Sequence, residues 1–313
     1  LFYDGDISKW KKLANTLRLR LGMRISQIAP AEAEKQVKAA FANGVFESND
    51  DNCIMHHGDI AFNGDLSDYR GNGLAHAFIG NDNADHFSSL LVDFLRTNND
   101  PRLPMLATPK TTSGVIWGGA IQPGEDLYVG VPSGSFQWDV FGGSTATSGI
   151  QSYLKQNTTP FLHVSYSETQ LLLAEAAFRT WITGSAADFY KKGVEAGVKQ
   201  LAIYGATEPT QGAIDTFVNA HPLQSGNEMK QISTQLWVTY LFNSIEAYSN
   251  WRRTGFPVLD PITAPDSETG GVVPTRFYYP NDELQKNEAN YLDALSRMGG
   301  TNDWLKKVWW DAN

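Results

Sequence analysis

A long glycine-rich segment, residues 46–160, separates two stretches of the chain in which apolar residues recur at helical spacing. Its central part, residues 111–148, contains eight glycines and no lysine or arginine, yet it carries five large aromatic residues. A loop region of this length inside a compact chain is usually either functional or disordered, and disordered segments are poor in aromatic residues. We therefore expect an ordered surface here, suited to apolar groups or sugar rings rather than to phosphates.

The flanking stretches predict a mainly α fold. Helices are expected over residues 6–28, 31–43, 84–98, 165–183, 186–203, 211–220, 228–249 and 282–297, and short strands over 114–117, 127–131 and 272–279. Paired helices of about 15–20 residues joined by short loops are typical of an α-solenoid, although no fixed repeat stands out. We expect a single domain over 1–313, with a helical part (1–45), a loop-rich insertion (46–160) and a second helical part (161–313).

Two of the expected helices carry a specific prediction. In the first helix, Trp10, Leu13, Leu17 and Leu21 form an apolar stripe, so these side chains, including Trp10, are expected to be buried. Residues 167–170 (SETQ) fit a capping box in front of the apolar run that follows.

Two later positions predict close packing and ion pairing. Gly193 and Gly197 leave a helix surface bare, which lets a neighbouring helix approach closely. Arg252 and Arg253 follow a helix and precede a glycine, so we expect them to cap free carbonyls and to pair with an acid such as Glu246.

Composition excludes several classes of protein. The 313 residues carry a net charge of −9 with a pI of about 5.1, which disfavours nucleic acid and anionic lipid as partners, since both demand a basic face. No run of about 18 apolar residues could span a bilayer. The single cysteine, Cys53, forms no disulfide within the chain and no Cys-based metal site, so we expect a free, half-buried thiol.

Short motifs in a fixed order connect the chain to a known family. They are residues 5–24 (GDISKWKKLANTLRLRLGMR), 99–103 (NDPRL), 130–134 (GVPSG), 167–177 (SETQLLLAEAA), 235–237 (QLW), 246–257 (EAYSNWRRTGFP), 279–283 (YPNDE) and 308–311 (VWWD). Together they resemble the SusD/RagB family of bacterial outer-membrane nutrient-binding lipoproteins, in its SusD-like group.

The resemblance implies a mainly α fold with tetratricopeptide-like helix pairs and a loop-rich ligand face. It further implies a cell-surface lipoprotein that caps a SusC-type TonB-dependent transporter and captures an oligosaccharide, or in some relatives a peptide, for import without catalysis. The chain begins without an initiator Met or a signal peptide, and the family's N-terminal portion is missing from it. We therefore expect a piece of a longer protein, whose lipid anchor lies outside this chain.

Aromatic side chains in the loop-rich insertion are the candidates for ligand binding. A sugar ring packs its C–H face on an aromatic plane, and Trp and Tyr offer large contact areas at little cost in side-chain freedom. We predict that Trp117, Tyr128, Trp138 and Phe136 line the ligand platform. Packing into the core remains the alternative for each of them.

Two other functions remain open. A peptide-binding or protein-interaction scaffold of helical repeats would use the same helix pairs. A glycosidase would need two carboxylates across the scissile bond, and Glu125, Asp126 and Asp139 lie among the loop aromatics. Nothing in the sequence singles out one of these acids as a proton donor.

Metal ligation has little support. His56 and His57 are adjacent, so their side chains point apart, and no third zinc ligand has a suitable spacing. Residues 81–85 (NDNAD) alternate oxygen-bearing side chains like the start of a calcium loop, but glycine and glutamate are missing from its sixth and twelfth positions. No cofactor is expected, apart from a structural calcium ion of the kind that some relatives bind.

Overall fold

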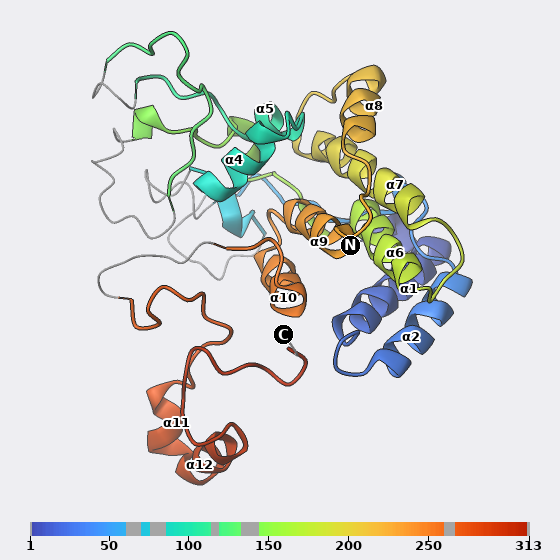
Figure 1. The fold of residues 1–313 in the computed structure, drawn as a ribbon, viewed down its shortest axis with the longest axis vertical. Coiled ribbons are helices and arrows are strands. Elements are labelled where there is room, and N and C mark those ends of the chain that lie inside the picture. The colour runs from blue at the N-terminus through green and yellow to red at the C-terminus, as the bar shows by residue number, and fades with distance from the viewer. Residues whose placement is uncertain are drawn as a thin grey trace.

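Helices dominate the structure, a computed structural model that describes residues 2–60, 70–75, 86–113, 119–132, 144–259 and 267–311. The α-helices are α1 (Ile7–Arg24), α2 (Pro30–Ala42), α4 (Ser89–Thr97), α5 (Arg102–Leu106), α6 (Tyr166–Phe178), α7 (Ala186–Lys199), α8 (Gln211–Ala220), α9 (Glu228–Thr239), α10 (Ser244–Thr254), α11 (Asn281–Lys286) and α12 (Glu288–Arg297). The mainly α fold class with tetratricopeptide-like helix pairs is thereby confirmed (Figure 1). Within the described ranges, no helix combines the length and the apolar character that a membrane crossing requires.

The pair α6 and α7 forms the centre of the helical part. A Cβ atom placed on Gly193 would lie 2.7 Å from Leu171 Cγ, and one placed on Gly197 would lie 2.9 Å from Ser167 Oγ. The hydroxyl of Ser167 donates to the carbonyl of Gly193 at 2.8 Å. The prediction that the two glycines let a neighbouring helix approach closely is confirmed, and the neighbour is α6.

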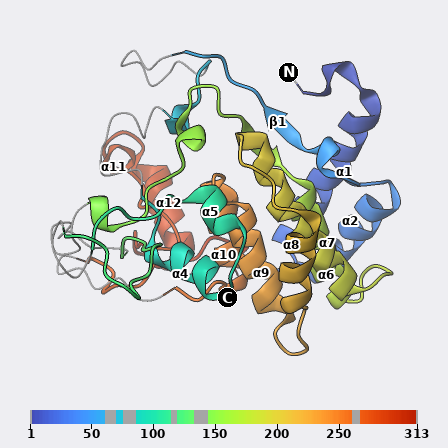
Figure 2. The same ribbon diagram turned by 90° about the horizontal axis from the view of Figure 1, so that it is seen from above.

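The helical core and the loop-rich regions lie on different sides of the molecule. Figures 1 and 2 both place α1, α2, α6 and α7 together on one side. The described loops between α4 and residue 160, and the segment that carries α11 and α12, lie on the other side in both views.

A two-stranded antiparallel sheet closes the base of the loop-rich insertion. Strand β1 (Cys53–Met55) pairs with β2 (Phe161–Val164), with Cys53 opposite Val164 and Met55 opposite Phe161. The chain therefore leaves the helical core at β1 and returns to it at β2. Between these strands, α4 and α5 bury apolar side chains in the same core as α6 and α7, which anchors the insertion.

Two acidic side chains of α6, Glu168 and Glu175, are buried because each has an arginine partner. The guanidinium of Arg253 donates to Glu175 at 2.7 and 2.8 Å, and Arg179 also pairs with Glu175 at 2.9 Å. Arg20 of α1 forms an ion pair with Glu168 at 2.5 Å. A charge buried without such a partner would be strongly destabilising.

These contacts correct two predictions about partners. Arg253 is structural as expected, but it pairs with Glu175, whereas Glu246 pairs with Arg24 at 2.5 Å. The cap of α6 is Ser165, whose hydroxyl accepts from the amide of Glu168 at 3.0 Å. The predicted capping box at 167–170 was two residues too late, because α6 already begins at Tyr166 and the hydroxyl of Ser167 donates to the Gly193 carbonyl of α7 instead.

The predicted buried face of α1 was wrong in part: Leu13 is buried and Leu17 packs against a core cluster, but the two ends of the stripe are exposed. Trp10 is 42% exposed and Leu21 is 64% exposed, whereas Thr16, Leu19 and Met23 are buried. The hydroxyl of Thr16 accepts from the amide of Phe46 at 3.1 Å, so a polar residue occupies the buried face. Apolar spacing alone points to another face because α1 carries leucines on several sides.

Two predicted long helices are interrupted. The range 228–249 is divided into α9 and α10 by a turn over residues 240–243, and 282–297 is divided into α11 and α12 at Asn287, whose φ is −143°. Neither break contains glycine or proline, which explains why the sequence pattern runs through both. The prediction of a helix over 211–220 is confirmed as α8.

The predicted strands do not form in the described residues. Residues 127–131 contribute one isolated bridge, between Val131 and Ser88, and 272–279 form no strand. Residues 114–117 lie outside the described ranges.

Candidate functional site

Tyr128 is the predicted ligand residue that lies within the described part of the chain; Trp117, Phe136 and Trp138 lie outside it. The Tyr128 ring is half-buried against the main hydrophobic core, and this burial raises the pKa of its phenol. Its chain neighbour Val129 donates its amide to Ser148 Oγ at 3.0 Å, and the amide of Ser148 donates to the Val129 carbonyl at 2.7 Å. Tyr128 therefore sits on a fixed stretch of backbone with one part of its ring in the core.

A carboxylate cluster holds the adjacent loop. Lys110, which is nearly buried, pairs with Glu125 at 2.6 Å, and the hydroxyl of Ser113 donates to the same carboxylate at 2.5 Å. These hydrogen bonds, with that from Lys110 first, lower the pKa of Glu125 to about 2. Asp126 is paired with Arg96.

These pairings define what the two acids can do chemically. A general acid must hold a proton near the working pH, which requires a raised pKa. Glu125 has the opposite shift, so it anchors the loop as a permanent anion. Asp139, the third acid considered for a glycosidase, lies outside the described residues.

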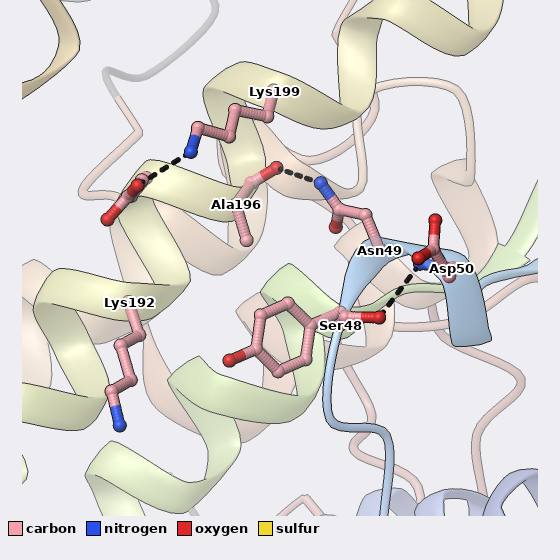
Figure 3. A pocket seen from close by; sticks show the side chains of 8 residues that line it. Ser48, Asn49, Asp50, Lys192, Ala196 and Lys199 are labelled. Atoms are coloured by element: carbon pink, nitrogen blue, oxygen red, sulfur yellow. Dashed lines mark hydrogen bonds and ion pairs between the residues drawn. The ribbon is translucent and has the colours of Figure 1, made fainter. Parts of the chain in front are cut away.

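A polar cavity of about 340 Å³ lies between α7 and the turn that precedes β1 (Figure 3). Its lining residues are Ser48, Asn49, Asp50, Tyr166, Lys192, Glu195, Ala196 and Lys199. Residues 192, 195, 196 and 199 share one face of α7, since positions three, four and seven apart lie on the same side of a helix. Asn49 crosses the cavity and donates to the Ala196 carbonyl at 3.3 Å.

The charges around this cavity are nearly balanced. Lys199 pairs with Glu195 at 2.8 Å, while Lys192 has no ion-pair partner among the described residues. Burial, followed by the charges of Glu195 and two further acids, raises the pKa of Tyr166, so its phenol stays protonated as a donor. The Oδ1 atom of Asn49 is buried and accepts no hydrogen bond from the described residues. The cavity can therefore hold one small polar group, but it offers a single aromatic wall.

The residues considered for thiol or metal chemistry are not arranged for it. Cys53 is buried, and burial raises the pKa of its thiol, which keeps it protonated and unreactive. His56 and His57 belong to no group of three metal-ligating side chains in the described ranges. The predicted calcium-like run 81–85 lies outside those ranges.

An exposed aromatic group in the C-terminal segment was missed by the sequence analysis. Phe277 is 78% exposed and Tyr278 is 40% exposed, and both lie against the ring of Trp304. Their sequence signal was a run of three consecutive aromatic residues, 277–279, but Trp304 lies 26 positions after Tyr278, and the pattern does not show that it meets them.

Comparisons with known proteins place the chain among relatives of known structure. Residues 1–280 match the model of a SusD-like family described as starch-binding and associating with the outer membrane. A solved structure described as a chitin-binding protein is 70% identical, with a TM-score of 0.92, over 100% of this chain and 66% of that protein. The chain thus spans slightly less than two thirds of that relative.

More distant structures share the fold. A Bacteroidetes SusD-like protein is 26% identical with a TM-score of 0.85, covering all of this chain and 71% of its own. A SusD homolog from Bacteroides uniformis is also 26% identical, with a TM-score of 0.79, covering 100% of this chain and 66% of its own. No curated protein matches the chain.

Proposed function

The chain belongs to the SusD-like family, and from this premise we propose that it is a non-catalytic binding protein that captures an oligosaccharide at the cell surface. The observation that carries the proposal is the 70% identity, over the full length of the chain, to a chitin-binding protein. We propose chitin-derived oligosaccharides, chains of N-acetylglucosamine, as the ligand.

The loop-rich insertion is the proposed ligand face. Trp117, Phe136 and Trp138 would stack on sugar rings, beside Tyr128 at the edge of the core. Stacking suits such a ligand because each pyranose ring has an apolar C–H face, whereas its hydroxyl and acetamido groups need hydrogen-bonding partners. The absence of Lys and Arg from residues 111–148 favours a neutral glycan over a polyanionic one.

Binding without cleavage is the second part of the proposal. Its support is the state of the two acids that precede Tyr128 in the sequence: the hydrogen bond from Lys110 keeps Glu125 an anion, and Asp126 is paired with Arg96. The two-carboxylate mechanism of a glycosidase needs one acid that keeps its proton.

The third part concerns location and partner. The family description supports association with the outer membrane. We propose a lipid anchor outside this chain and a SusC-type TonB-dependent transporter as the partner that receives the oligosaccharide.

The experiment that tests the function is a calorimetric titration with chitohexaose, followed by chromatography of the recovered sugar. Saturable binding of an intact hexasaccharide is expected. Shorter products that accumulate with time would favour the glycosidase, whereas binding to a purified transporter with no response to any glycan would favour the protein-interaction scaffold.

A further inference from the structure

Three aromatic side chains form an exposed cluster outside the loop-rich insertion. We call Phe277, Tyr278 and Trp304 the ring platform. The ring centroids of Tyr278 and Trp304 are 4.2 Å apart with planes inclined by 35°, and those of Phe277 and Trp304 are 6.1 Å apart. Leaving a Phe side chain 78% exposed forfeits most of the stabilisation that its burial would contribute. A clustered exposed apolar surface of this kind marks a binding site more often than isolated exposed residues do.

The backbone holds these rings in place from both sides. Before the pair Phe277–Tyr278, the amides of Thr275 and Arg276 donate to the Trp304 carbonyl at 2.9 and 3.2 Å. After the pair, Tyr279 and the side chain of Asn302 exchange hydrogen bonds of 3.0 and 3.1 Å. The rings are therefore presented on a short stretch that is fixed at each end.

Two further contacts fix the platform itself and attach it to the helical core. The indole N–H of Trp304 donates to Glu268 at 2.9 Å, which sets the orientation of the central ring. From α10, the phenol of Tyr248 donates to the Pro274 carbonyl at 2.6 Å, and Arg252 donates to the Thr275 carbonyl at 3.0 Å. Because the rings are ordered before any ligand arrives, a ligand that stacks on them loses little of its binding energy to ordering the protein.

The polar groups beside the platform indicate the chemistry of its ligand. Desolvation raises the pKa of the Tyr278 phenol, and the charges of Glu268 and Asp303, which lie near it, raise it further. The Tyr278 hydroxyl has no hydrogen-bond partner among the described residues, so it can donate to a ligand. Arg276 also lies beside the rings, since its Nε donates to the Phe277 carbonyl. The carboxylates offer acceptors to hydroxyl and amide donors, and the net charge of −9 on the chain disfavours carboxylate or sulfate groups.

We propose that the ring platform is a glycan-stacking site for a neutral oligosaccharide, separate from the loop-rich insertion. The inference rests on the proposed function, since it adds a second contact region for the same class of ligand. A second copy of the chain could also cover exposed rings, but the free phenol and the two nearby carboxylates suit a hydroxylated chain better than an apolar protein face.

The test compares variants that remove exposed rings from different places. Phe277→Ala/Tyr278→Ala removes two rings of the platform. Trp309→Ala is the matched control, because Trp309 is 73% exposed on the same segment and makes no ring contact with the platform. Phe277→Ala alone guards against misfolding of the double variant, and Phe277→Tyr/Tyr278→Phe retains both rings.

Calorimetric titration with chitohexaose is expected to show binding weakened by about tenfold in the double variant, as for the loss of two stacking contacts. The Trp309→Ala variant should stay within about twofold of the unaltered chain, and the ring-retaining variant should bind more tightly than the double alanine variant. Polygalacturonate, a polyanionic glycan, should not bind.

Two results would overturn the proposal while the proposed function stands. In the first, Phe277→Ala and Phe277→Ala/Tyr278→Ala both bind chitohexaose like the unaltered chain. In the second, sedimentation shows a dimer of the unaltered chain that becomes a monomer in Phe277→Ala/Tyr278→Ala with glycan binding intact, so that the platform holds a second copy. A chain that binds no neutral glycan at all overturns the proposed function together with the platform.

Discussion

Helix α6 and the C-terminal segment 267–311 use their side chains in opposite ways. In α6, every residue from 167 to 176 is buried, including Glu168 and Glu175, and each of these acids has an arginine partner. In the C-terminal segment, α11 and α12 bury no residue, and Phe277 and Trp309 are largely exposed. The difference teaches where function can be placed: side chains committed to the core have no surface left for a ligand, whereas exposed rings held by the backbone do.

Removing a buried charge from α6 should produce the largest effect on stability. Arg253→Met leaves Glu175 buried with Arg179 as its remaining partner, so the free energy of unfolding should fall by about 3–5 kcal/mol. Chemical denaturation followed by circular dichroism measures the change. The control, Arg297→Met, breaks an exposed pair with Asp293 and should cost less than about 1 kcal/mol. Equal losses for the two variants would show that burial does not distinguish the two regions.

The close contact between α6 and α7 should tolerate no extra atom. A methyl group added by Gly193→Ala meets Leu171 at 2.7 Å, and overpacking of this kind should reduce stability by about 1–3 kcal/mol. Gly212→Ala in α8 is the matched control, since its Cβ would meet no atom within 4 Å. The control should leave the unfolding midpoint unchanged or raised, and a stabilised Gly193→Ala would contradict the described packing.

The variant Trp138→Ala tests the loop-rich insertion as the proposed ligand face. We expect it to weaken binding of chitohexaose by about 1–3 kcal/mol through lost aromatic contact, with little change in melting temperature. Calorimetry and thermal melting of the same sample measure both quantities. A drop of many degrees with unaltered binding would assign Trp138 to the core.

The smallest expected effect concerns how the stability of the fold depends on the protonation of Glu125. The pKa of Glu125 is lowered to about 2 in the folded chain, against about 4.3 in an unfolded one. A carboxylate whose pKa is lowered by folding stabilises the folded state at pH values above its unfolded pKa. This contribution is lost as the pH falls from about 4.3 through about 2. NMR titration of the Glu125 carboxyl carbon should locate the transition.

A pair of lysine variants sharpens this prediction. Lys110→Met removes the main hydrogen bond to Glu125 and should raise its pKa toward the ordinary value. Lys307→Met removes the same charge from an exposed position and should leave the Glu125 titration unchanged. If Lys110→Met leaves the pKa of Glu125 unchanged, Lys110 is not the cause of the lowered pKa.

Local sequence patterns predicted the elements whose determinants are local. Apolar spacing predicted α8, and the glycines at 193 and 197 predicted close packing, because helix periodicity and a missing side chain act within a few residues. The local patterns failed where the structure depends on a partner that is distant in the sequence. Arg253 and Glu175 are 78 positions apart, so no local pattern could pair them. Ser167 does not cap α6 because its hydroxyl donates to the carbonyl of Gly193, 26 positions away.

The candidate site shows the same division. The sequence predicts a short strand over 272–279, which does not form, and it does not indicate that the aromatic residues at 277–278 are exposed. Their exposure follows from tertiary hydrogen bonds to Trp304 and Asn302, which bring residues 302–304 beside residues 275–279. Trp10 is the reverse case, since it lies in a helical stripe but remains 42% exposed.

Hydrogen exchange measured by mass spectrometry, with and without saturating chitohexaose, tests most directly whether exposed rings bind the ligand while the core only supports them. The account predicts slower exchange in peptides from residues 111–148 and 272–279, and unchanged exchange in α6 and α7. Protection confined to α6 and α7, or no protection in either ring-bearing region, would contradict it.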